Sequence, residues 1–294
     1  MNLRHIAMAL CVMLIWGVNF AVAKVTVGEM PPLMVNAIRF GLVAIILVPC
    51  VKMPRDKLVD ILILATIMAP FHFGLMFIGL TGSDAAAAAI AMQLSVPFAA
   101  LMASFYFHDR LGRQRAIGMV VAFAGVVVLA GEPKMDGELL MLGLIVLSAA
   151  MWGVGNIQIK RIGDINPFAL SAWMALFAAP ELLVLSLLLE HDHWHAITAA
   201  NWTAWGGILY MAVLVAIVSY AMWYHLLRTY QVNQVVPFSL LGPVFGVAAG
   251  IVLLGEAATW QKLVGGAITV SGVAMISLYR PPPKPVPDEN RAEG

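Results

Sequence analysis

The stretch WGVN at residues 16–19 and the stretch WGVGN at residues 152–156 decide the fold that we predict for this chain. A lysine follows each stretch, and further matches continue in the same order through both halves: Pro32 with Pro167, Pro97 with Pro243, Asp109 with Glu256, Gln114 with Gln261, Gly118 with Gly265 and Gly125 with Gly272. The chain is therefore predicted to contain one unit twice, at residues 1–132 and 138–280, followed by a tail at 281–294.

The composition is that of a membrane protein. Of 294 residues, 62% are hydrophobic and 11% are charged, whereas soluble domains carry roughly 25% charged residues. The mean hydropathy is +0.90, so lipid must be the solvent for most of the chain. The net charge of +1 argues against a basic surface for nucleic acid. We expect an all-α protein, because the two-residue alternation of a membrane β-barrel is missing.

Apolar runs of about 20 residues, the length that a membrane-spanning helix needs, occur in ten places: 5–24, 33–51, 58–80, 84–107, 114–131, 138–159, 168–189, 204–228, 234–255 and 261–279. Each repeat then holds five helices. Because five is odd, the two repeats must cross the membrane in opposite orientations. Inverted repeats are typical of secondary transporters, whose substrate site lies near the midplane between the halves.

The placement of lysine and arginine predicts the orientation, since cytoplasmic loops carry an excess of both. With a cytoplasmic N-terminus, the outside segments hold Lys24, Lys134 and Lys262, and the inside segments hold Arg4, Lys52, Arg55, Lys57, Arg110, Arg113, Arg115, Lys160, Arg161, Arg228, Arg280, Lys284 and Arg291. Both termini are therefore predicted to lie in the cytoplasm, with the protein in a bacterial inner membrane. The proline-rich tail should be extended and solvated.

The second repeat carries a motif over its last two helices. Pro243 is followed by GEAATWQKLVG at residues 255–265, a Gly-Glu-x-x-Thr-x-x-Gln-x-x-Gly pattern. With the Trp-Gly elements of helices one and six, it resembles the drug/metabolite transporter superfamily, specifically its EamA-type ten-helix transporters. The first repeat departs from this pattern, with His108-Asp109 where the family tends to have Gly-Glu. The chain is most similar to the bacterial aromatic amino-acid exporters of this family, a resemblance that implies efflux of aromatic and other neutral amino acids.

Polar and aromatic side chains at membrane depth mark the candidate substrate cavity, because such groups are costly in lipid. We expect it to be lined by Trp16, Asn19, His72, Gln93, Trp152, Asn156, Tyr220 and Tyr224. The alternative is that these residues only hydrogen-bond or pack between helices. The predicted midplane holds no lysine or arginine, which favours neutral or zwitterionic substrates over phosphorylated ones. His72, with an unperturbed pKa near 6.5, is the best-placed group for proton coupling.

Arg39 and Glu181 are the two intramembrane charges, both predicted in the outer half, on helices two and seven. A salt bridge between them and separate snorkelling to the interface are both open, and Glu181 is a lesser candidate for a proton carrier. Small residues and prolines have a packing interpretation first, with a hinge in helix nine as the functional alternative. These residues are Pro97, Pro237, Pro243, Gly242, Gly246 and Gly250.

Enzyme function is not expected, and neither is a cofactor. No nucleophile–base pair is apparent, and a GxxxxGK[ST] loop for ATP is absent. The segment HDHWH at residues 191–195 lacks metal-ligand spacing and is predicted to be an interfacial loop. Cys11 and Cys50 are interpreted as small buried apolar residues. The expected partners are a small-molecule substrate and the lipid bilayer, and a homodimer is left open. The competing functions are a passive channel, a membrane-embedded partner subunit and a drug exporter.

Overall fold

All the regular structure that the computed structural model describes is helical, within residues 1–107, 112–131 and 137–278. The first half contains α1 (Leu3–Glu29), α2 (Pro32–Leu47), η1 (Val48–Cys50), η2 (Arg55–Lys57), α3 (Leu58–Thr66), η3 (Ile67–Gly74), α4 (Leu75–Gly82), α5 (Ala85–Ala91), η4 (Met92–Leu94), α6 (Ser95–Phe107) and α7 (Arg113–Ala130). The second half contains α8 (Glu138–Ile162), α9 (Pro167–Leu189), α10 (His193–Ala199), α11 (Trp202–Leu209), η5 (Tyr210–Ser219), α12 (Tyr220–Thr229), α13 (Val232–Val235), η6 (Val236–Leu240), α14 (Leu241–Leu254) and α15 (Trp260–Ser277). The predicted tail at 281–294 lies outside the described residues.

Nine helical stretches in the described part of the chain are long and apolar enough to cross a membrane. They correspond to the first nine predicted spans. The tenth predicted span coincides with α15, which is not among the nine. That helix has 18 residues and begins with Trp260, Gln261 and Lys262, so a polar first turn lowers the mean hydropathy of a short helix. The chain is a multi-pass membrane protein, and a count of ten spans stays a prediction.

The first helix is longer than its apolar run. The prediction placed it at 5–24 with Lys24 in an outside segment, whereas α1 continues to Glu29. Lys24 therefore belongs to the helix, and its ammonium donates hydrogen bonds to the carbonyl oxygens of Leu80 (2.8 Å) and Thr81 (3.3 Å) at the end of α4. A long flexible side chain can satisfy its charge beside a helix end, where free carbonyls are available, so hydropathy ends the span too early.

Four of the long helices change their helical type along their length. The π-helical segments η3 and η5 interrupt the third and eighth spans, and the tight 3₁₀ segments η4 and η6 interrupt the fourth and ninth. Pro97 and Pro243 are each the third residue of the α-helix that follows a 3₁₀ segment. Proline lacks the N–H that would bond back along the helix, so the interruptions occur where the α-helical ladder is already broken. Pro237 lies inside η6 itself.

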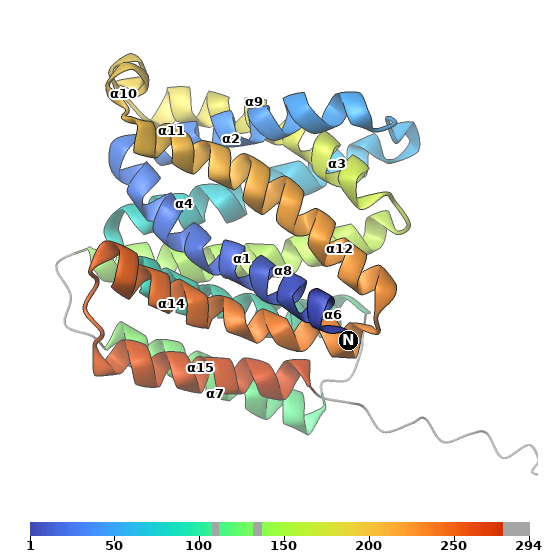
Figure 1. Ribbon diagram of the computed structural model, residues 1–294, viewed down its shortest axis with the longest axis vertical. Coiled ribbons are helices and arrows are strands. Elements are labelled where there is room, and N and C mark those ends of the chain that lie inside the picture. Colours follow the sequence, from blue (N-terminus) through green and yellow to red (C-terminus); the bar gives the residue numbers. More distant parts are fainter. Residues whose placement is uncertain (108–111, 132–136, 279–294) are drawn as a thin grey trace, which may run out of the picture.

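Two antiparallel helix pairs lie at opposite edges of the molecule, α7 with α15 at one edge and α2 with α9 at the other (Figure 1). At the first edge, glycines bring the backbones into contact. A Cβ on Gly118 would lie 2.8 Å from the carbonyl oxygen of Gly272, and a Cβ on Gly125 would lie 2.6 Å from that of Gly265. The sequence analysis matched Gly118 with Gly265 and Gly125 with Gly272. In the structure the contacts are crosswise, so that Gly118 contacts the match of Gly125, and Gly125 contacts the match of Gly118.

Glycine also allows close contact where α1 and α8 cross their neighbours. A Cβ on Gly17 would lie 2.8 Å from the carbonyl oxygen of Gly242 in α14, and a Cβ on Gly153 would lie 3.0 Å from the backbone of Ala99 in α6. These are the glycines of the two Trp-Gly elements. Along α14, Gly246 and Gly250 face the buried alanines of α5, as the packing interpretation expects. Gly242 differs, because open space surrounds its own Cβ position.

The Gly-Glu-x-x-Thr-x-x-Gln-x-x-Gly motif is explained by capping and packing. Gly255 ends α14 with a positive φ of 70°, which suits glycine. The carboxylate of Glu256 accepts hydrogen bonds from the backbone N–H groups of Ala85 (2.6 Å) and Ala86 (2.9 Å) at the start of α5, where the helix dipole favours an anion. Thr259 is the N-cap of α15. Glu190 caps the start of α2 in the same way, through the N–H groups of Leu33 and Met34.

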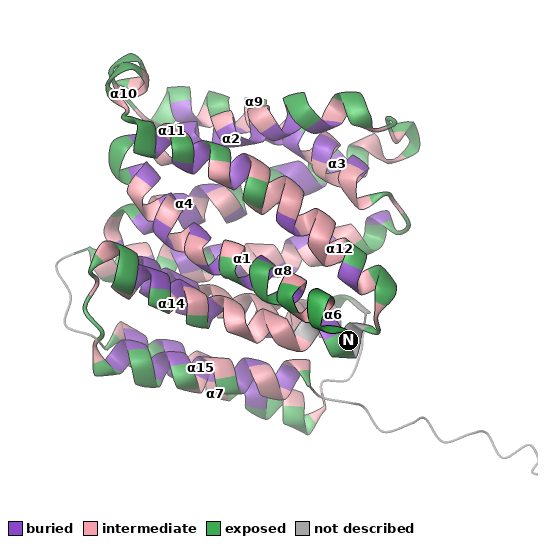
Figure 2. Cartoon of the chain, viewed as in Figure 1, coloured by how far each residue is buried: buried purple, intermediate pink, exposed green. Residues whose placement is uncertain are grey.

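Exposed residues lie along much of the outside of the helices (Figure 2). Many of them are large and apolar, for example Val252, Leu188 and Val120, each at least 70% exposed. In a bilayer these faces contact lipid tails. The interpretation of Cys11 and Cys50 as buried residues is wrong, because both thiols are exposed. The physical reason is that an apolar run in a membrane protein has two destinations, the protein interior and the lipid, and hydrophobicity does not distinguish them.

Candidate functional site

Trp16 lies in an aromatic cluster between α1 and the start of α12. Its indole N–H donates a hydrogen bond to the hydroxyl of Ser219 at 2.6 Å. Its ring lies 5.6 Å from the ring of Tyr220 and 5.4 Å from that of Trp223. Tyr220 stacks in turn on Tyr224 at 6.0 Å. We call this group of Trp16, Ser219, Tyr220, Trp223 and Tyr224 the α1–α12 cluster. Trp223 and Ser219 were not among the predicted cavity residues.

His72 and Trp152 form a second cluster, between η3 and α8. Their rings are 4.9 Å apart, and Nδ1 of His72 lies 3.0 Å from the carbonyl oxygen and 2.9 Å from the hydroxyl of Ser148. The same hydroxyl donates to the backbone carbonyl of His72 at 2.9 Å. His72 is only 2% exposed. We call this group of His72, Ser148 and Trp152 the η3–α8 cluster.

A π-helical segment stands beside each cluster. His72 belongs to η3, which also contains Pro70, and Tyr220 comes directly after η5. A π-helical turn rotates the residues that follow it, and such turns often occur at functional sites. Here they set the directions in which His72 and Tyr220 point. Hydropathy contains no signal for η5. Pro70 was the one available signal for η3, since it breaks the α-helical hydrogen-bond ladder.

Arg39 lies beside the second cluster, and three phenylalanine rings lie against its guanidinium. Its guanidinium carbon is 4.5 Å from the ring of Phe40, 4.4 Å from that of Phe73 and 5.4 Å from that of Phe77. Phe73 follows His72 directly in the chain and touches its ring at 4.5 Å. Arg39 also lies within electrostatic range of His72 and Tyr220. The position of Arg39 in the outer half of the membrane stays a prediction.

Neither predicted arrangement of the two intramembrane charges is seen. Arg39 is only 4% exposed, so it does not snorkel to the interface. Glu181, half-buried on α9, accepts a hydrogen bond from the hydroxyl of Thr66 at 3.0 Å, while its other carboxylate oxygen is buried without a partner among the described residues. No ion pair joins Arg39 to Glu181 in the described part of the chain.

The remaining predicted cavity residues are less tightly placed. Asn19 is 9% exposed, and its side-chain oxygen has no hydrogen-bond partner among the described residues. Gln93 lies in η4 and Asn156 on α8, each half-buried. The described hydrogen bonds and ring contacts do not join any of these three amides to either cluster. Asn19 comes one turn after Trp16 on α1, so it lies on a similar face of that helix.

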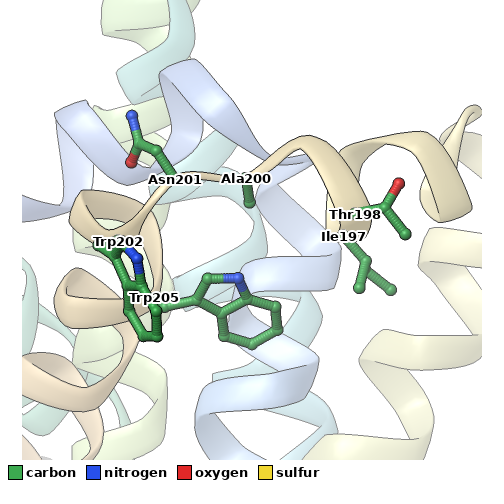
Figure 3. A pocket seen from close by; sticks show the side chains of 6 residues that line it. All are labelled: Ile197, Thr198, Ala200, Asn201, Trp202 and Trp205. Atoms are coloured by element: carbon green, nitrogen blue, oxygen red, sulfur yellow. The ribbon is translucent and has the colours of Figure 1, made fainter.

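Two cavities lie outside the predicted site. One of about 490 Å³ is lined by α10, α11 and the residues between them, with Asn201, Trp202 and Trp205 prominent (Figure 3). Asn201 also donates a hydrogen bond to Glu29 at 2.8 Å. The other, of about 320 Å³, lies beside α1, α11 and the end of α14, near Val22, Tyr210 and Leu254. Sequence reasoning missed both. The first is lined in part by the helix α10 (His193–Ala199), which was expected to be a loop.

The histidine-rich segment contributes to α10 and makes local contacts. Nε2 of His193 lies 3.0 Å from the hydroxyl and 3.1 Å from the carbonyl oxygen of Ser186. Within the residues that the structure describes, no three histidine, cysteine or acidic side chains are grouped as a metal site would require. The segment therefore anchors α10 to the end of α9.

Comparison with known proteins gives consistent results over nearly the whole chain. The model of the EamA-like transporter family matches residues 3–131 and again residues 139–278. A Salmonella typhimurium protein named "Probable amino-acid metabolite efflux pump" is 34% identical over 276 residues, which cover 90% of this chain and 92% of that protein. An Escherichia coli K12 protein of the same name is 32% identical, covering 93% of this chain and 94% of that protein.

A solved crystal structure shares the fold, with a TM-score of 0.60 at 19% identity over 95% of this chain and 98% of that chain. The family match covers both halves and the two named relatives exceed 30% identity. The helical fold with its nine apolar stretches agrees with a transporter embedded in a bilayer rather than an enzyme. The chain belongs to the EamA-like transporter family of small-molecule membrane transporters.

Proposed function

We propose that this transporter exports small neutral metabolites, chiefly aromatic and other neutral amino acids, across the bacterial inner membrane. It works by alternating access between two inverted five-helix repeats, with both chain ends in the cytoplasm. The observation that carries the proposal is the pair of tryptophan clusters. Trp16 and Trp152 occupy matching places in the two halves. Each lies against a ring from the other half of the chain, Tyr220 directly after η5 for Trp16 and His72 in η3 for Trp152.

The inverted repeat is supported by helix contacts as well as by the two family matches. If a two-fold axis relates the halves, a contact between one pair of positions must recur between their mates. The four glycines of α7 and α15 fulfil this condition, because Gly118 contacts Gly272 and Gly125 contacts Gly265. Likewise α1 packs on α14 while α8 packs on α6, which are the equivalent crossings.

The substrate class is supported by the chemistry of the two clusters. Tryptophan, tyrosine and histidine rings offer apolar faces with a few hydrogen-bonding atoms, the combination that small-molecule sites use. The two named relatives are called amino-acid metabolite efflux pumps, which supports both the amino-acid substrate and the outward direction. The family resemblance adds the preference for aromatic side chains.

The proposal is tested with purified protein in liposomes, by uptake of radiolabelled phenylalanine, tryptophan, leucine and alanine without ATP. Uptake is compared at equal pH and across a pH gradient. We expect saturable uptake that other neutral amino acids inhibit. If His72 carries protons, uptake responds to the pH gradient, and indifference to the gradient leaves facilitated diffusion with His72 as a binding residue.

Other outcomes separate the competing functions. Flux that does not saturate with substrate indicates a passive channel. Uptake of hydrophobic cations with no inhibition by amino acids indicates a drug exporter. If folded protein transports no neutral amino acid, the substrate assignment is wrong.

A further inference from the structure

Arg39 is a buried cation without an anionic partner among the residues that the structure describes. The side chain is 4% exposed, and its Nε has no hydrogen-bond partner in the described part of the chain. No carboxylate of the described residues pairs with its guanidinium. A guanidinium has five N–H donors and stays charged, and an unpaired charge in a membrane interior is costly. Arg39 is therefore a feature that the resting contacts of the protein do not explain.

The other buried cation shows what a structural role looks like in this protein. Lys262 is 2% exposed, yet its ammonium lies 2.5 Å from the carboxylate of Asp84 and donates to the carbonyl oxygen of Ala257 at 3.0 Å. This carboxylate and this carbonyl oxygen both belong to the chain itself. Arg39 differs, because the described contacts of its guanidinium are with aromatic rings, which do not accept its N–H donors in a planar, two-pronged hydrogen bond.

The three rings hold the guanidinium in place without neutralising it. Phe40 comes from α2, Phe73 from η3 and Phe77 from α4, all within 5.4 Å. Cation–π attraction offsets part of the cost of burial. The guanidinium is thus held against Phe73, whose ring lies 4.5 Å from that of His72. It also interacts electrostatically with His72 and Tyr220, which belong to different halves of the chain.

We propose that Arg39 binds the α-carboxylate of the transported amino acid. Carboxylates match the fork of a guanidinium with two parallel hydrogen bonds, and a ligand carboxylate would supply the missing counter-ion. The side chain of the substrate then lies against the tryptophan clusters. This inference rests on the proposed function and makes it narrower: the substrate carries a free carboxylate, and aromatic amines without one are rejected.

The test combines substrate analogues with substitutions of Arg39. Liposomes with wild-type protein receive labelled phenylalanine in competition with unlabelled phenylalanine, phenylalaninamide or phenethylamine. We expect phenylalaninamide and phenethylamine to compete at least tenfold more weakly, since a charge-assisted hydrogen bond contributes about one to two powers of ten in affinity. Equal competition by phenylalaninamide overturns the inference, and this arm needs no variant at all.

The substitution Arg39→Gln should raise the KM for phenylalanine at least tenfold while bringing the competition by phenylalaninamide close to that of phenylalanine. Arg39→Lys, which keeps the charge but loses the two-pronged geometry of the guanidinium, should give an intermediate KM. It also serves as a second variant if Arg39→Gln does not fold.

The matched control is Arg161→Gln, which removes an exposed guanidinium lying over the single ring of Tyr106 at 5.9 Å. This variant should transport like the wild type. An unchanged KM in folded Arg39→Gln overturns the inference and leaves the proposed function intact. A wild type that transports no amino acid overturns the proposed function itself.

Discussion

The edge contact of α7 with α15 and the two aromatic clusters show two different uses of positions that match between the halves of the sequence. At the edge, glycines at matched positions contact each other crosswise, Gly118 against Gly272 and Gly125 against Gly265. In the aromatic clusters, matched positions carry different chemistry: Trp16 meets Tyr220 and a serine hydroxyl, while Trp152 meets the imidazole of His72. Packing of small residues depends on size alone, so both copies keep it. A binding site gains from unlike groups, so the copies differ there.

The largest expected effect concerns the orientation of the halves, on which the whole comparison depends. In a protein without Cys11 and Cys50, cysteines introduced at Thr81 and Asp192 should react with an impermeant thiol reagent from the periplasm. Cysteines at Arg55 and Arg113 should react only after the membrane is opened. Thr81, Asp192, Arg55 and Arg113 are all exposed in the structure. Periplasmic labelling of Arg113→Cys would show that the repeats are not inverted.

The glycine contact should be sensitive to one added methyl group. In Gly125→Ala, the new Cβ would lie 2.3 Å from the hydroxyl of Thr269 and 2.6 Å from the carbonyl oxygen of Gly265. Overpacking of this kind costs about 1–3 kcal/mol, so the melting temperature in detergent should fall. Gly143→Ala on α8 is the control, because nothing lies within 4 Å of its Cβ position. Equal melting temperatures for the two variants would contradict the close contact of α7 with α15.

The η3–α8 cluster should lose more activity than stability when its imidazole is removed. His72→Ala deletes the ring that contacts Trp152 and that lies within hydrogen-bond distance of the Ser148 hydroxyl. The hydroxyl of Ser148 can still donate to the backbone carbonyl of residue 72. We expect the uptake rate to fall about tenfold or more, a loss that corresponds to the roughly 1–3 kcal/mol of an unpaired buried polar group. Ser148→Ala is the control, since His72 keeps the carbonyl oxygen of Ser148 at 3.0 Å. Normal uptake by folded His72→Ala would assign the cluster to packing.

The smallest effect distinguishes the two tryptophans. Trp16→Phe removes the N–H that bonds to Ser219 at 2.6 Å, and should weaken transport about two- to tenfold, in line with a net hydrogen-bond contribution of about 0.5–1.5 kcal/mol. Trp152 makes no hydrogen bond through its indole to a described residue, so Trp152→Phe should stay within about twofold of the wild type by the same arithmetic. If Trp16→Phe and Trp152→Phe change the KM and the maximal rate to the same extent, the proposed difference between the two clusters is wrong.

Several site residues could be predicted because membrane depth makes polar groups conspicuous. His72, Trp152, Trp16 and Tyr220 were all identified in this way, and the structure brings them together as two pairs. Arg39 was not among the predicted cavity residues, because a residue count along one helix does not show which side chains of neighbouring helices lie against it. Trp223 was missed because tryptophan near a helix end is also typical of the membrane interface.

Hydropathy determined by itself that this chain crosses the membrane many times, because a spanning helix needs only apolar length and satisfies its own backbone. The internal matches predict a repeated unit, and the family model matches each half of the chain separately. Only the tertiary structure decided which faces meet. The π-helical segments rotate His72 and Tyr220 relative to the rest of their helices, and Glu256 and Glu190 cap helices far away in the chain. Three phenylalanines from three segments surround Arg39. These contacts depend on the rotation and crossing of packed helices, which no single run of residues contains.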